Sequence, residues 1–244
     1  MSTAAAPIKL PENLKNPNKI LACLPEAKKL KYNNEELVVT PHSIRVTRAL
    51  RMLGIKVPSP ILHYYDWSGD FTPYEHQKMT SAFLTMHDKA LVLNEIGTGK
   101  TQSALWACDY LMSIGYIKKV LIISPLSTLE RVWGDSIFMN FPHRQAVTLY
   151  GTSARRKELL TTDADFFVIN HDGFSIISEE ANGMFDLIII DEASVLRNPS
   201  TNRFKIVKKY LMNHPHTRLW MMTGTPTPND PTDAWALAKL VDSP

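Results

Sequence analysis

The feature that most constrains the fold of this chain is an apolar run that leads into a glycine-rich loop and then into a helical pattern. The run is ALVLN (90–94), the loop continues as EIGTGKT, and QSALWACDYLM follows. Glycines let a backbone turn tightly and approach an anion closely, and the N–H groups at the start of a helix bind phosphate. A strand, a loop and a helix in this order are the context that a phosphate loop requires. The segment therefore predicts a nucleotide site in an α/β fold.

One position departs from the strict phosphate-loop pattern G-x-x-x-x-G-K-[ST], because Asn94 stands where the first glycine is expected. Asparagine tolerates left-handed backbone geometry better than most residues, so the departure does not exclude the site. We expect Lys100 to reach the β- and γ-phosphates and the Thr101 hydroxyl to ligate Mg²⁺. The residues predicted to bind the nucleotide are Asn94, Gly97, Thr98, Gly99, Lys100 and Thr101. A chance glycine turn is the competing interpretation, and the flanking strand and helix argue against it.

Short apolar runs alternate with helical patterns from Tyr74 onward. A helical pattern covers about residues 74–87, and the strand candidates after it are 90–94, 119–124, 146–150, 165–170, 185–190 and 218–222. Strands that alternate with helices indicate βαβ units and a parallel sheet that is buried on both faces. The pattern predicts an α/β domain with a mostly parallel sheet and helices on both faces.

Two carboxylates end one of these apolar runs, in FDLIIIDEAS (185–194). Ligands of open parallel sheets bind at the carboxyl ends of the strands, where the phosphate loop also lies. We expect Asp191 to hold Mg²⁺ through its water shell and Glu192 to polarise an attacking water. Lys100, Asp191 and Glu192 are thus the candidate catalytic residues, and Thr101 and Asp191 are the candidate metal ligands. A solvated strand end is the competing interpretation.

The first 70 residues differ in character from the rest. They hold ten Lys/Arg and six Asp/Glu, whereas the remainder holds 17 and 18. Residues 1–39 are predicted to form an irregular arm. Residues 40–54 are predicted to form a helix, capped by Thr40 and followed by Gly54. A basic segment of this kind could touch nucleic acid, although a solvated surface is the commoner explanation.

Composition excludes several classes of protein. The chain has 244 residues, 44% of them apolar and 21% charged, which is ordinary globular composition. No apolar run approaches the roughly 18 residues of a membrane span, and the start MSTAAAPIKL lacks the apolar core of a signal peptide. Cys23 and Cys108 are far apart and match no metal-ligand spacing. We predict a cytoplasmic location and no membrane partner.

Two weaker clusters leave alternatives open. Arg155, Arg156 and Lys157 follow a predicted strand and could meet phosphates, and a solvated helix face explains them equally well. The aromatic residues of the connector 57–73 could stack on a base, and core packing is favoured.

From about residue 71 to 244 the chain resembles the Swi/Snf-type DNA-dependent ATPases of helicase superfamily two, especially the compact phage helicases. NEIGTGKT is similar to that group's D-E-x-G-x-G-K-T, and IIIDEASVLRNPS to its D-E-A-H-x-x-K-N, with Ser194 and Arg197 in place of His and Lys. The other segments that carry the resemblance are PYEHQ (73–77), LIISPLSTLERVWGDSI (121–137), DFFVINHDGF (165–174) and MTGTPTPNDPTDAWAL (222–237). The order of all six segments makes the resemblance specific.

The resemblance implies a role for each segment. Gln77 would contact adenine, so the implied cofactors are ATP and Mg²⁺. The segment 121–137, with its P-L-S and W, would lie along one nucleic-acid strand, and 165–174 occupies the place of a further strand-contacting motif. The T-G-T segment would couple the ATP state to the grip on nucleic acid. The implied nucleic-acid and coupling residues are Pro125, Leu126, Ser127, Asn170, His171, Thr223, Gly224 and Thr225.

The implied architecture is a first RecA-like motor lobe over 71–244, preceded by a small helical or irregular extension over 1–70. Such motors have two lobes, so we expect a second RecA-like lobe in cis beyond Pro244 or in trans, and only slow hydrolysis by this lobe alone. DNA is the implied partner, with RNA as the alternative, in the cytoplasm of the cell or of a phage host. A competing hypothesis is a free-standing ATP- and DNA-binding regulatory module with little turnover. A small-molecule kinase would need an arginine-rich lid, which we do not find in the sequence.

Overall fold

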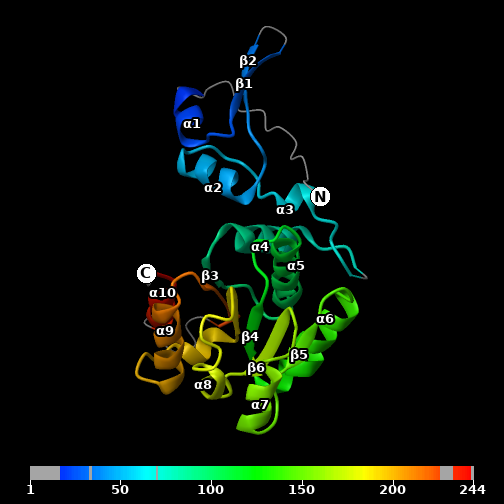
Figure 1. Cartoon of the computed structure of the whole chain (residues 1–244), viewed down its shortest axis with the longest axis vertical. Helices are drawn as coiled ribbons and strands as arrows, with labels where there is room; N and C mark the ends of the chain where they lie inside the picture. Colours follow the sequence, from blue (N-terminus) through cyan, green and yellow to red (C-terminus); the bar gives the residue numbers. More distant parts are fainter. Residues whose placement is uncertain (1–16, 33–34, 70, 226–232, 243–244) are drawn as a thin grey trace. The chain divides into compact units, whose positions relative to one another are not determined.

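The computed structural model describes residues 17–32, 35–69, 71–225 and 233–242, and the chain forms two compact units (Figure 1). The first unit is Met1–Tyr65 and the second is Asp66–Pro244. The sequence placed the division at residues 70 and 71, slightly later along the chain.

The amino-terminal unit has its own secondary structure and its own core. Its elements are α1 (Pro17–Cys23), β1 (Lys28–Tyr32), β2 (Glu35–Val39), α2 (Ile44–Met52) and α3 (Ile61–Tyr64), with β1 and β2 antiparallel. The predicted irregular arm is therefore wrong for its described part, while residues 1–16 lie outside the described residues. Ile20 of α1 and Val38 of β2 pack with Val46 and Leu50 of α2. Packing between elements, which short sequence windows do not reveal, stabilises them.

Helix α2 starts later than the sequence predicted. Ser43 caps it, because the Ser43 hydroxyl accepts a hydrogen bond from the Val46 N–H at 3.3 Å, whereas Thr40 is buried. Gly54 lies just past the helix with φ of 80°, the left-handed geometry expected of a glycine at that position. The predicted cap Thr40 is therefore wrong, because Thr40 is buried and Ser43 caps the helix.

The second unit is built on a six-stranded sheet with the order β3-β8-β7-β4-β6-β5, in which every neighbouring pair is parallel. The strands are β3 (Lys89–Val92), β4 (Val120–Ser124), β5 (Ala146–Thr148), β6 (Phe166–Asn170), β7 (Leu187–Asp191) and β8 (Arg218–Met222). All six predicted strands are confirmed, with ends that shift by at most two residues. The central strands β4 and β7 are buried along their whole length, which explains their continuous apolar sequences.

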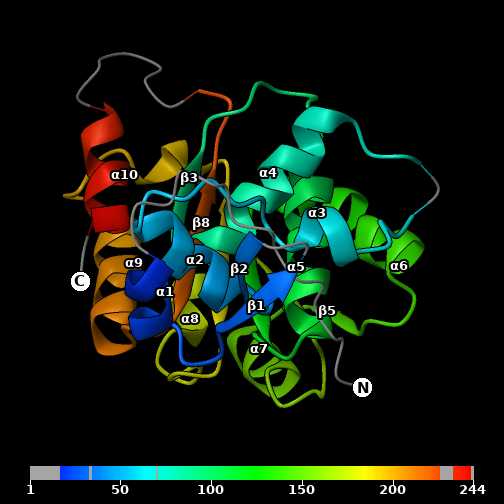
Figure 2. The ribbon, with the colours of Figure 1, turned by 90° about the horizontal axis from the view of Figure 1, so that it is seen from above.

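Helices cover both faces of this sheet, as predicted (Figures 1 and 2). Helices α8 (Phe174–Ile177), α9 (Asn202–Asn213) and α10 (Asp233–Asp242) lie on one face, and their apolar residues join one core with the strands. Helices α5 (Lys100–Ser113) and α6 (Asp135–Asn140) lie on the other face. Helix α4 (Glu75–Met86) packs against α5, and α7 (Ser153–Leu159) follows β5. Short turns complete the lobe: η1 (Leu126–Thr128), η2 (Leu129–Gly134) and η3 (Ala193–Leu196).

The aromatic connector contributes to this packing. Trp67 lies edge-on to Trp106 of α5, with ring centroids 5.5 Å apart, and the Trp106 indole N–H donates to the Ser68 carbonyl at 2.6 Å. Core packing, the favoured interpretation of Trp67, is confirmed. None of the helices in the described ranges has both the length and the apolar character that a bilayer span requires.

Candidate nucleotide and nucleic-acid site

The candidate residues gather at one edge of the sheet, because the carboxyl ends of parallel strands all lie on the same side. Strand β8 pairs with β3 on one side and with β7 on the other. The phosphate loop after β3 and the acidic end of β7 therefore flank Thr223, which directly follows β8. The ends of β4, β6 and β5 continue this edge.

The phosphate loop has the backbone geometry that its glycines predicted. Gly97 and Gly99 have φ values of 81° and 77°, and Gly99 directly precedes the first residue of α5. A Cβ at Gly99 would overlap the side-chain amide of Gln77. A side chain at Gly99 is therefore opposed both by the backbone and by its neighbour.

Lys100 is almost fully buried within this loop. Its Nζ donates to the carbonyl oxygens of Asn94 at 3.0 Å and of Glu95 at 2.9 Å, so the loop folds around the ammonium group. Thr101 is the next residue of α5 and is half-buried. Both side chains lie at the helix amino terminus, where the partial positive charge of the helix favours an anion.

Asn94 and Gln77 connect the loop to α4. The Asn94 amide donates to the Thr80 hydroxyl at 3.0 Å, and Gln77 Nε2 donates to the Thr98 carbonyl at 3.3 Å. Among the described non-glycine residues only Glu192 has a positive φ, so Asn94 does not use the left-handed geometry that asparagine would tolerate. Its side chain, which glycine would lack, fixes the start of the loop to α4.

The acidic strand end is rigidly held. Asp191 is buried, its Oδ1 accepts the Glu192 N–H at 3.0 Å, and its Oδ2 accepts the Trp133 indole N–H at 3.0 Å. A carboxylate has about four acceptor sites, so these two bonds leave sites for a hydrated cation. Glu192 has φ of 50° and ψ of 50°, a left-handed conformation that costs about 1–3 kcal/mol in a residue with a side chain. Strain of this kind is concentrated at functional sites.

His171 also contacts this strand end. Its Nε2 lies 2.9 Å from the Asp191 carbonyl oxygen, and burial lowers its pKa below the ordinary value for histidine. His171 directly follows β6, so it brings the end of β6 to the end of β7.

Trp133 was missed as part of the site. The sequence placed its segment along a nucleic-acid strand, but the Trp133 side chain is fully buried and bonds to Asp191. That assignment is therefore wrong for the tryptophan itself. The residue lies in η2, a turn of π-helix, a distortion found often at functional sites.

The same segment does expose residues at its start. Leu126 is 59% exposed, Ser127 is exposed, and Pro125 is half-buried. Leu126 and Ser127 border a hollow of about 360 Å³, which is also lined by Arg131 and Tyr150. Neither residue was predicted from the sequence, although Tyr150 follows a strand and could have indicated this edge of the sheet.

Asn170, His171 and the T-G-T segment differ in exposure. Asn170 and His171 are half-buried, Thr223 is fully buried, Gly224 is half-buried and Thr225 is exposed. The Thr223 hydroxyl accepts the Thr225 N–H at 3.1 Å. Of the quoted segment 222–237, residues 226–232 lie outside the described residues. Because Thr223 is buried, its side chain contacts neighbouring protein groups and does not reach a large ligand.

The basic side chains of α7 form hydrogen bonds and ion pairs with other residues of this chain. Arg156 is buried and donates to the Asn170 side chain at 2.8 Å and to the Gly151 carbonyl at 3.0 Å. Neither alternative from the sequence, phosphate contact or a solvated face, describes Arg156. Arg155 pairs with Glu158 and Lys157 with Glu180. Arg156 instead orients a side chain at the end of β6.

A glycine-rich phosphate loop between a strand and a helix, opposite an acidic strand end in a parallel sheet, defines a RecA-like ATP-binding lobe. The family described as "SNF2-related domain" matches residues 59–243, and the chain belongs to this family. The resemblance inferred from six motifs is confirmed. The described lobe is the ATP-binding lobe of a protein of this family.

Several relatives are similar over the same region. Putative protein p41 of Acyrthosiphon pisum secondary endosymbiont phage 1 is 27% identical, over 70% of this chain and 39% of that protein. The uncharacterized ATP-dependent helicase YqhH of Bacillus subtilis is 27% identical, over 70% of this chain and 29% of that protein. The chromatin-remodeling ATPase INO80 of Sclerotinia sclerotiorum is 28% identical, over 62% of this chain and 9% of that protein. This chain therefore spans less than half the length of each.

A solved structure supports the fold. The Sulfolobus solfataricus SWI2/SNF2 ATPase core in complex with dsDNA superposes with a TM-score of 0.60 at 20% identity, over 72% of this chain and 36% of that chain. The RecA-like α/β fold predicted from the sequence is confirmed.

Proposed function

We propose that this chain supplies the first motor lobe of an ATPase that moves on DNA. The observation that carries the proposal is the position of β8 between β3 and β7. This order brings the phosphate loop, the T-G-T segment and the Asp191–Glu192 pair to adjacent positions at one edge. Hydrolysis and a change of grip on nucleic acid can be linked there over a short path.

The contacts of the loop support the nucleotide roles that we propose. Lys100 and the loop N–H groups bind the phosphates, and Gln77 lies against the loop where it reads adenine. Mg²⁺ when bound neutralises phosphate charge, and Thr101 and Asp191 would hold it. The donor set fits, because a hydroxyl and a carboxylate oxygen are ligands that Mg²⁺ prefers. Glu192, held beside Asp191 by its strained backbone, orients the attacking water.

We assign nucleic-acid contacts to residues that follow β4 and β6 at this edge of the sheet. Leu126, Ser127 and Pro125 contact a phosphate backbone without reading its sequence. Asn170 and His171 support a second contact, and Thr223, Gly224 and Thr225 transmit the nucleotide state. The solved relative was bound to double-stranded DNA, which makes duplex DNA our first choice of partner.

A second RecA-like lobe, in cis or in trans, completes the motor. An arginine supplied to the transferring phosphoryl group can raise the rate by about 10³–10⁵-fold. We therefore expect this chain to bind Mg-ATP and to hydrolyse it slowly on its own.

The test is ATP binding and hydrolysis with and without duplex DNA, for the wild type, Lys100→Ala and Glu192→Gln. Lys100→Ala should weaken Mg-ATP binding, whereas Glu192→Gln should keep binding and lose hydrolysis by about 100-fold or more. Nucleotide binding without any hydrolysis in the wild type would favour a regulatory module. Strong DNA-stimulated turnover by this chain alone would contradict the need for a second lobe.

A further inference from the structure

The amino-terminal unit carries a charge opposite to that of the lobe. Residues 1–65 contain ten Lys/Arg and four Asp/Glu, a net charge of +6, whereas residues 66–244 contain 17 and 20, a net charge of −3. The modest +3 of the whole chain conceals this difference. A net charge of this size in a small unit attracts polyanions.

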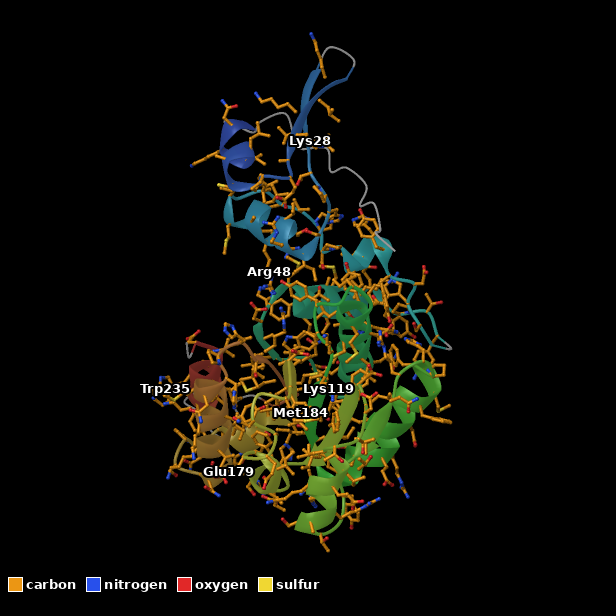
Figure 3. The ribbon with its side chains drawn as sticks, viewed as in Figure 1. Lys28, Arg48, Lys119, Glu179, Met184 and Trp235 are labelled. Carbon is orange, nitrogen blue, oxygen red and sulfur yellow. The ribbon has the colours of Figure 1, made fainter. Side chains whose placement is uncertain are left out.

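The positive charge of this unit lies on its surface. Lys19 of α1 and Lys28 and Lys31 of β1 are exposed, as are Arg45 and Arg51 of α2. Figure 3 shows Lys28 on the hairpin strand and Arg48 on α2, so the cations are spread over several elements of the unit. Glu26 pairs with Arg45, and Glu36 lies opposite Lys31 in the register of β1 and β2. The net charge of +6 already counts these carboxylates, so the unit keeps an excess of cations.

We propose that the amino-terminal unit carries a second nucleic-acid contact surface, in addition to the edge of the lobe, which binds without ATP. The cations sit on a unit with its own apolar core, so their arrangement does not depend on the nucleotide state. Contacts of this type neutralise phosphates without reading the bases, and they would hold the chain on DNA while the lobe changes its grip.

The test is the salt dependence of duplex DNA binding by the full chain without nucleotide. One variant replaces Lys19, Lys28 and Lys31 by Ala, and the matched control replaces the exposed lobe lysines Lys118, Lys205 and Lys209 by Ala. Each phosphate contact contributes about 0.9 to the slope of log K against log salt. The first variant should lower the slope by about 2–3 and the affinity by about tenfold or more at low salt, and the control should change neither.

Two outcomes would overturn the proposal. One is an equal effect of both triple variants, and the other is no effect of the first. Tight binding of the wild type to anionic lipid vesicles, without any DNA difference between the triple variants, would assign the surface to a membrane instead. Unchanged circular dichroism of all variants shows that the surface changes leave the fold intact.

A different observation concerns Trp133. Its indole N–H is the side-chain donor to Asp191, and the residue follows the exposed Leu126 and Ser127 by less than two helical turns. The segment that we propose to contact nucleic acid at one end is thus bonded, at the other end, to the carboxylate that we propose as a Mg²⁺ ligand. We infer that Trp133 is a positioning residue that fixes the Asp191 carboxylate, an inference that rests on the proposed function.

Trp106 provides a matched control. It is also fully buried, and its indole N–H donates to a carbonyl, that of Ser68, away from the site. Trp133→Phe and Trp106→Phe remove the same atoms and one indole hydrogen bond each, to a carboxylate and to a carbonyl, so both should lower stability. Only Trp133→Phe should raise the Mg²⁺ concentration needed for half-maximal ATP binding, by about tenfold, while ATP binding without Mg²⁺ stays unchanged.

The readout is binding of a fluorescent ATP analogue over a Mg²⁺ titration. If the wild type shows no Mg²⁺-dependent binding, the proposed function fails. If the wild type shows it and the two variants have the same Mg²⁺ midpoint, Trp133 is only structural.

Discussion

The two units of this chain differ in the size of their hydrophobic cores and in the elements that form them. The lobe buries both faces of a parallel sheet, with fully buried strands at its centre. The amino-terminal unit closes a small core between α1, the hairpin and α2, and carries the excess of positive charge. Small cores are marginal, since a short chain buries a smaller fraction of its surface. The candidate ATP site depends on side chains held in fixed positions by a large core, whereas a charged surface of the kind proposed for the amino-terminal unit tolerates a smaller core.

The substitution with the largest expected effect tests whether the amino-terminal unit unfolds independently of the lobe. Leu50 is fully buried at the centre of the amino-terminal core, and Leu50→Ala should cost about 2–5 kcal/mol. That loss should open the amino-terminal unit, so hydrogen exchange of α2 should accelerate while that of β4 and β7 stays slow. Rapid exchange in both units would show that they unfold as one.

A substitution with a smaller expected effect tests how much a buried ion pair stabilises the lobe. Asp109 of α5 is buried and accepts Arg144 Nε at 2.7 Å and a His143 ring nitrogen at 2.8 Å. Arg144→Met should cost about 1.5–3 kcal/mol in urea unfolding, because it removes a charged donor from a buried carboxylate.

The matched control for that change is Arg155→Met, which removes the exposed pair with Glu158 and should cost less than about 0.5 kcal/mol. Equal costs at the two positions would mean that burial of Asp109 does not set the energy.

The smallest expected effect is a pH dependence of stability that is confined to the amino-terminal unit. Burial lowers the pKa of His42, whose Nε2 lies 2.9 Å from the Pro58 carbonyl oxygen, with Tyr64 and His63 facing the ring. The unfolded chain therefore takes up the proton first, below about pH 6.5, and the stability of the amino-terminal unit falls as the pH drops from there to the folded pKa.

Exchange of α2 amides at pH 7 and pH 5.5, corrected for the intrinsic exchange rate, measures this fall. His42→Gln should flatten it, and His216→Gln, at an exposed histidine of the lobe, should leave it unchanged. A fall that persists in His42→Gln would assign the pH dependence to another group.

Much of the lobe could be predicted from the sequence, because its strands are continuous apolar runs and its site lies in contiguous motifs. Gly97, Gly99 and Lys100 could be assigned since backbone freedom and charge belong to the residue itself. The hairpin and α1 could not, because their short segments are stabilised by contacts with α2. The cap at Ser43 and the burial of Arg156 were likewise hidden, since each depends on neighbours that are brought close by folding.

The sequence by itself determined the family, the parallel sheet, the ATP site and the presence of a basic segment. These follow from periodicity, from glycine and charge at fixed spacing, and from the order of six motifs. The tertiary structure alone decided that Asn94 binds α4, that Trp133 holds Asp191, and that the positive charge belongs to a separate folded unit. The physical reason is that a hydrogen bond or a core between residues distant in sequence has no local pattern, and exists only once the chain has packed.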